Sequence, residues 1–141
     1  MSDAIKHECG IAVIRLLKPL DYYIKKYGTA LYGINKLYLL MEKQHNRGQD
    51  GAGVANIKFN VEPGTHYIDR HRATGSSAIK QIFAKINSQF EDVHQKYPEK
   101  LKDATWLKKH LSYTGELFLG HLRYGTYGGN TMENCHPFLR Q

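Results

Sequence analysis

The sequence predicts an α+β fold with antiparallel strand pairing, and two observations support this prediction. First, the predicted elements follow one another as strand, helix, hairpin, helices and strand. Second, the 141 residues, of which 41% are hydrophobic and 23% are charged, have the composition of a globular protein. This length is sufficient for one domain with its own hydrophobic core.

The first half of the chain is predicted to contain a strand, a helix and a hairpin. The apolar run 9–14 is typical of a buried strand of about six residues. Apolar residues recur at intervals of three and four over 28–45, which indicates an amphipathic helix. Two further strands, joined by a turn at Pro63-Gly64, are predicted at 51–57 and 65–72.

The second half is predicted to contain two helices and a strand. Ser76-Ser77 can cap a helix whose apolar positions are Ile79, Ile82, Phe83, Ile86 and Phe90. Another helix is expected from about Glu99 to His110, followed by a strand over 116–124. The residues that this strand places on one face are Leu117, Leu119, His121 and Arg123.

The charge and the composition limit which binding partners and which cellular compartment we expect. The net charge of +7 would suit an anionic partner, but the lysines of 80–109 alternate with acidic residues. This mixture is typical of solvated helix faces, so we do not predict nucleic-acid binding. No apolar run reaches the roughly 18 residues that span a bilayer, and no secretory leader is visible. With only two cysteines, a reducing, cytoplasmic setting is expected.

Three short segments contain residues that regular structure does not require. They are Cys9-Gly10, the glycine-rich segment 46–53, and segment 120–126, which includes Arg123 and Thr126. Each has a structural explanation, such as a buried thiol, an arginine at a helix end or a threonine in a turn. Together they indicate a ligand site, because a thiol and a guanidinium suited to a carboxylate would meet a glycine-rich corner whose backbone can approach a ligand closely.

In this order, the three segments resemble the glutaminase domain of class II glutamine amidotransferases, which are N-terminal-nucleophile hydrolases. Asn134-x-x-Pro137-Phe138 is similar to a fourth segment of that family. Gln49-Asp50 after Arg47-Gly48 looks most like the glutamine amidophosphoribosyltransferases of purine synthesis. Two alternatives stay open: another class II amidotransferase with a different ammonia acceptor, and a small basic binding module without catalysis.

The resemblance implies a role for five residues. Cys9 would be the catalytic nucleophile, with its own α-amine as the general base, so residues 1–8 would be a propeptide. Arg123 and Thr126 would bind the α-carboxylate of glutamine, and Arg47 and Gly48 would pack beside Cys9 and orient it. The fold would be the N-terminal-nucleophile sandwich of antiparallel sheets and helices.

The resemblance also implies what lies beyond this chain. Residues 9–141 would be an incomplete glutaminase domain, joined in the parent enzyme to a phosphoribosyltransferase domain that uses magnesium and accepts the ammonia. No cofactor is expected in the present segment, no metal site is expected at Cys135-His136, and the full-length enzyme would be a homo-oligomer.

The sequence departs from the family pattern in two ways. The Asn-Gly pair of the family's oxyanion hole does not occur in the 141 residues, and neither does the aspartate that would bind the substrate amine. We therefore expect the chain alone to be inactive. In addition, residues 16–29 and 91–112 lengthen the usual pattern and are interpreted as surface insertions that contact the missing domain.

Overall fold

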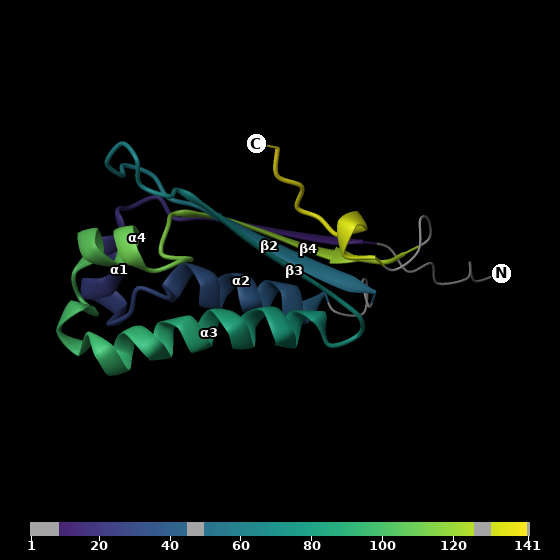
Figure 1. The fold of residues 1–141 in the computed structure, drawn as a ribbon, viewed down its shortest axis with the longest axis horizontal. Helices are drawn as coiled ribbons and strands as arrows, with labels where there is room; N and C mark the ends of the chain where they lie inside the picture. The colour runs from purple at the N-terminus through teal and green to yellow at the C-terminus, as the bar shows by residue number, and fades with distance from the viewer. Residues whose placement is uncertain (1–8, 45–49, 126–130, 141) are drawn as a thin grey trace.

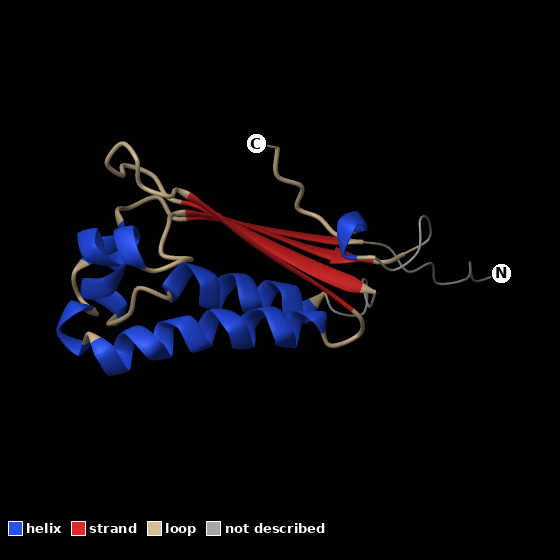
Figure 2. Ribbon diagram, in the orientation of Figure 1, coloured by secondary structure: helices blue, strands red, loops and turns tan. Residues whose placement is uncertain are grey.

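The computed structural model describes residues 9–44, 50–125 and 131–140 of the chain. Four strands form one antiparallel sheet in the order β1-β4-β2-β3, which confirms the predicted α+β class and antiparallel pairing (Figures 1 and 2). The strands are β1 (Gly10–Arg15), β2 (Gly51–Ile57), β3 (Ile68–Thr74) and β4 (Leu117–Arg123). The hairpin predicted around Pro63-Gly64 is the β2–β3 pair.

Four α-helices lie on one side of this sheet. The long helices α2 and α3 run along the face of the sheet, whereas α1 and α4 lie together at one end of the molecule (Figure 1). The helices are α1 (Leu20–Tyr27), α2 (Tyr32–Lys43), α3 (Ala78–Lys96) and α4 (Ala104–His110). Short 3₁₀ turns occupy Pro98–Lys100 and Met132–Asn134.

The structure moves several predicted boundaries. The helix expected from residue 28 begins at Tyr32, because Gly28 has a φ of 76° and instead ends α1. Ser77 precedes α3 but makes no side-chain cap, since its hydroxyl accepts a hydrogen bond from the Gln81 amide. The helix expected from Glu99 begins at Ala104, where the Asp103 side chain accepts from the backbone N–H of Trp106.

The main core lies between the sheet and the helices α2 and α3. Alternate strand residues point into it, including Val54, Phe118 and Leu122, which are all at most 1% exposed. Gly33 lets α2 approach the sheet closely, because a Cβ at this position would run into the Phe118 ring. The amphipathic helices that the sequence predicts therefore bury their apolar sides here.

The opposite face of the sheet is largely open. Ile11 and Val13 of β1 are 65% and 55% exposed, and Leu119 of β4 is 36% exposed. The strand predicted at 9–14 is therefore confirmed as β1, but the prediction that it is buried was wrong. β1 is an edge strand with one covered face, and an apolar run alone does not show whether both faces are covered.

A second, smaller core joins the two stretches that were interpreted as insertions. Leu20 and Ile24 of α1 pack with Leu107 of α4 and with Leu111, and all four are at most 4% exposed. Residues 16–29 and 91–112 are thus not independent surface additions. They cover one another and form a single unit at the end of the sheet where β1 finishes.

Candidate functional site

Cys9 lies at the other end of the sheet, immediately before β1, and its side chain is exposed. The register pairs Gly10 with Leu122, so the start of β1 adjoins the end of β4. The Tyr124 N–H donates to Cys9 Sγ at 3.4 Å, and the thiol lies 3.8 Å from the Tyr124 carbonyl oxygen. The alternative that Cys9 is an ordinary buried hydrophobic residue is therefore wrong.

Asp50 connects the ends of three strands beside this thiol. Its carboxylate accepts a hydrogen bond of 2.7 Å from the Gly125 N–H, its own N–H donates to the Arg123 carbonyl, and its carbonyl accepts from the Gly75 N–H. These bonds fix the direction in which the chain leaves β4. From the sequence, Asp50 was identified only as part of the pair Gln49-Asp50, and no role was predicted for it. An aspartate before a glycine-rich strand is nevertheless a common local hydrogen-bond acceptor.

Arginines on the open face of the sheet hold the segment 131–140. Arg123 Nη1 donates to the Asn134 carbonyl at 2.8 Å, Arg72 Nη1 donates to the Cys135 carbonyl at 3.1 Å, and Arg70 Nη1 donates to the Pro137 carbonyl at 3.4 Å. The segment lies on the side of the sheet opposite the helices (Figure 1). Arg123, which the family resemblance assigns to substrate binding, therefore binds backbone of this chain in the structure.

The glycines of β2 make room for the same segment. A Cβ at Gly51 would lie 2.6 Å from Cys135 Sγ, and one at Gly53 would run into the His136 carbonyl. Sequence reasoning assigned these glycines to the approach of a ligand, whereas here they admit the chain's own backbone. Cys135 is fully buried as a result, and burial raises the pKa of its thiol.

His121 adds a neutral ring to the same face. Its ring centroid lies 4.6 Å from that of His136, and its Nδ1 is buried with no hydrogen-bond partner among the described residues. Burial, together with smaller effects of the nearby His136 and Arg123, lowers the pKa of His121 to about 4. His121 therefore stays uncharged near neutral pH.

The structure brings together two of the five predicted site residues. Cys9 and Arg123 lie at the same end of the sheet, because Cys9 contacts the backbone of Tyr124. Arg47, Gly48 and Thr126 lie outside the described residues, as does the stretch 1–8 that was interpreted as a propeptide. An exposed thiol can attack a carbonyl carbon, and an arginine at the same end of the sheet can bind a carboxylate of the same molecule.

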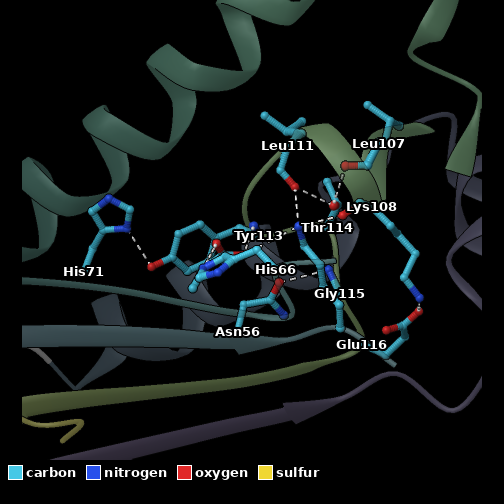
Figure 3. Close-up of polar contacts among 12 residues, drawn as sticks. Asn56, His66, His71, Leu107, Lys108, Leu111, Tyr113, Thr114, Gly115 and Glu116 are labelled. Carbon is cyan, nitrogen blue, oxygen red and sulfur yellow. Dashed lines mark hydrogen bonds and ion pairs between the residues drawn. The ribbon is translucent and has the colours of Figure 1, made fainter. Parts of the chain in front are cut away.

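A second cluster of polar side chains lies at the opposite end of the sheet, near α4 (Figure 3). Asn56 accepts from the Gly115 N–H at 2.9 Å and donates to the Leu117 carbonyl, while the Thr114 hydroxyl bonds the Leu107 and Leu111 carbonyls. These side chains satisfy backbone groups that would otherwise be buried without partners. We interpret this cluster as structural.

The side chain of Lys58 lies next to this cluster, and the residue is only 5% exposed. Its ammonium donates to the Lys108 carbonyl at 2.8 Å and to the Leu111 carbonyl at 2.9 Å, and it lies 3.8 Å from an Asp69 carboxylate oxygen. Lys108 in turn pairs with the Glu116 carboxylate. Burial lowers the pKa of Lys58, and the charge of Asp69 opposes this shift.

No family model, curated protein or solved structure matches the chain. The described residues include no group of three or more His, Cys, Asp or Glu side chains that could hold a metal ion. In the same part of the chain, no helix has the length and apolar character needed to cross a bilayer. Support for a function therefore comes from the sequence motifs and from the positions of their residues in the fold.

Proposed function

We propose that this chain is the N-terminal part of a glutamine amidophosphoribosyltransferase and that Cys9 is the nucleophile of its glutaminase reaction. The observation that carries the proposal is the exposed Cys9 thiol at the start of β1, in contact with the residue that follows Arg123. A thiol buried for packing alone would not be accessible at the end of a strand.

The proposed reaction has two steps. The Cys9 thiolate attacks the side-chain amide carbon of glutamine, the C–N bond breaks, and ammonia leaves with the proton taken up by the α-amine of a mature Cys9. Water then attacks the thioester carbon, which releases glutamate and restores the thiol. Arg123 binds the substrate α-carboxylate, and Thr126, Arg47 and Gly48 complete the substrate site. The ammonia passes to phosphoribosyl pyrophosphate in the second domain.

The fold is proposed to be half of the N-terminal-nucleophile sandwich. The exposed side chains of Ile11, Val13 and Leu119 support this, because an apolar sheet face in the complete domain would be covered by a second sheet. We also propose that the parent enzyme is cytoplasmic, since an exposed catalytic thiol must stay reduced. The family resemblance further leads us to propose that the full-length enzyme is a homo-oligomer.

The test is a Cys9→Ala substitution in the full-length parent enzyme. Glutamine-dependent synthesis should be lost, whereas synthesis from added ammonia should be kept, because the acceptor site lies in the other domain. Equal loss of both activities would contradict the proposal. In the unsubstituted parent enzyme, glutaminase activity without transfer of the ammonia to phosphoribosyl pyrophosphate would instead favour a class II amidotransferase with another acceptor.

Two further measurements test the substrate site and the general base. Arg123→Lys should chiefly raise KM for glutamine, because lysine cannot form the two-pronged bond to a carboxylate. N-terminal sequencing of active parent enzyme should begin at Cys9. Active enzyme that still begins at Met1 would rule out the α-amine as the base.

A further inference from the structure

A groove with a volume of about 670 Å³ lies between α1, α2 and the end of the edge strand β1. Its walls come from the insertion that starts at Leu16 and from the outer flank of α2. It lies away from Cys9, which precedes the opposite end of β1. The proposed glutaminase reaction makes no use of it.

The groove is positively charged. Four cationic side chains line it, and no aspartate or glutamate does: Arg15, Lys18, Lys36 and Lys43. Lys26 adds a further positive charge beside the groove, because its Nζ lies 5.6 Å and 5.5 Å from the ring centroids of Tyr22 and Tyr27. Asp21 of α1 lies close to a cation of its own helix, with 3.9 Å between its carboxylate and Lys25 Nζ. The ligand that this charge pattern attracts is anionic.

The groove also exposes apolar side chains between its cations. Leu39 and Leu40 are 52% and 36% exposed and lie between Lys36 and Lys43 on one flank of α2, at positions i, i+3, i+4 and i+7. Leu17 is 82% exposed at the mouth of the groove. A ligand that covers these leucines removes apolar surface from water, so it must carry apolar groups as well as negative charge.

We propose that this groove binds an acidic peptide segment of a partner protein, in which leucine-like side chains recur at helical spacing and carboxylates occupy other positions. The partner's apolar side chains pack on Leu39, Leu40 and Leu17, and its carboxylates pair with Lys36 and Lys43. Charge complementarity sets which segments bind, and the apolar contacts supply most of the buried area.

The arrangement of the tyrosines favours a peptide over a nucleic acid. Tyr32 stacks on Tyr27 with a centroid distance of 4.2 Å and on Tyr23 with 5.1 Å, so the rings use their faces on one another and not on a base. The exposed leucines offer no hydrogen bond to a base edge. A lipid bilayer fits less well too, because part of the apolar surface lies in a hollow that a flat bilayer surface does not fill.

The test uses the 141-residue chain and a short fluorescent peptide that has leucines at helical spacing and glutamates elsewhere. Fluorescence anisotropy should show binding that weakens as salt is added, because exposed ion pairs are screened. A peptide with the same leucines and with glutamine in place of glutamate should bind about tenfold more weakly. Equal binding of the two peptides would overturn the proposed charge recognition.

Two double variants separate the groove from the overall charge. Lys36→Glu with Lys43→Glu should weaken binding of the acidic peptide by about tenfold or more. Lys80→Glu with Lys96→Glu on α3 makes the same change in net charge at exposed positions outside the groove and should leave binding nearly unchanged. Equal losses in the two pairs, with unchanged melting curves, would overturn the proposal.

Competing ligands complete the experiment. A thymidine oligonucleotide and vesicles rich in phosphatidylserine are measured with the same variants. The proposal predicts that neither depends on Lys36 and Lys43 as the peptide does. Failure of the acidic peptide to bind, or tighter lysine-dependent binding of either competitor, would overturn it. All outcomes are independent of glutaminase activity, since the chain is measured without substrate.

Discussion

The two ends of the sheet differ in how their polar groups are held. At the end near α4, Lys58, Asp69 and Glu116 are at most 6% exposed, and each contacts an oppositely charged or hydrogen-bonding partner. At the other end, the Cys9 thiol is exposed and Arg123 binds a backbone carbonyl. The first end is completed by contacts within the described chain, whereas the second leaves a nucleophile open to solvent.

This difference shows that the segments 16–29 and 91–112 stabilise one end of the fold, while the thiol at the other end stays exposed. Lys58 binds two backbone carbonyls of the segment 91–112, and Asp69 accepts from the Tyr113 N–H that follows this segment. Buried groups of this kind are costly to disturb, because the remaining partner stays buried without compensation. Groups at the open end can change with much smaller effects on stability.

The largest expected effect is from Asp69→Ala. The substitution removes the carboxylate that accepts from the Tyr113 N–H at 3.1 Å and lies beside Lys58, so the free energy of unfolding should fall by about 3–5 kcal/mol. Urea unfolding measures the change. Asp21→Ala, which removes an exposed carboxylate beside Lys25, is the matched control and should cost less than about 0.5 kcal/mol. Similar losses in both variants would remove the proposed contrast between buried and exposed carboxylates.

A smaller effect is expected from Gly53→Ala at the open end. The new Cβ would meet the His136 carbonyl, so the segment 134–137 must move away from β2. The strain should lower the free energy of unfolding by about 1–3 kcal/mol. Thiol titration of the folded Gly53→Ala variant should also show faster reaction of Cys135, which is fully buried in the unsubstituted chain. An unchanged Cys135 rate would mean that the segment does not depend on Gly53.

Acid should weaken the open end through His121. Because its folded-state pKa is about 4 and its ordinary value is 6.5, the unfolded chain binds the proton first as the pH falls between these values. Stability is therefore lost over this window, by on the order of 1–2 kcal/mol after allowance for solvent. His121→Gln should reduce the slope of unfolding free energy against pH. It should not abolish the slope, because burial also lowers the pKa of His71.

The smallest expected effect on stability is that of Cys9→Ser. Because the thiol is exposed and precedes β1, the free energy of unfolding should change by less than about 0.5 kcal/mol. Alkylation of the folded, unsubstituted chain should modify Cys9 and spare Cys135, and peptide mapping by mass spectrometry identifies the modified residue. A large loss of stability in Cys9→Ser would show that the thiol is part of the packing, contrary to its placement at the open end.

The secondary-structure elements could be predicted from the sequence more accurately than their burial and their contacts. The strand at 51–57 matches β2 at both ends, because small and apolar residues there follow a local pattern. The side chains of Leu117, Leu119, His121 and Arg123 do share one face of β4, the open one, because every second residue points the same way. The start of α2 was misplaced, since Gly28 is the left-handed residue that ends α1 and α2 begins only at Tyr32.

The candidate site was predicted in part. The motifs selected Cys9 and Arg123, and strand register then placed them at one end of the sheet. Asp50 received no role, because its three hydrogen bonds reach β3 and β4, far away in sequence. The close packing of Gly53 against His136 could not be predicted from the local sequence pattern either, since the two residues lie on segments far apart in the sequence.

The sequence by itself determined the α+β class, the amphipathic character of the long helices and the position of the thiol at the start of a strand. These properties depend on residues that are near one another in the chain. Only the tertiary structure decided which face of β1 is covered, that α1 and α4 share a core, and that Lys58 is buried against Asp69. The physical reason is that burial depends on contacts between distant segments, so the same local pattern can be exposed or enclosed.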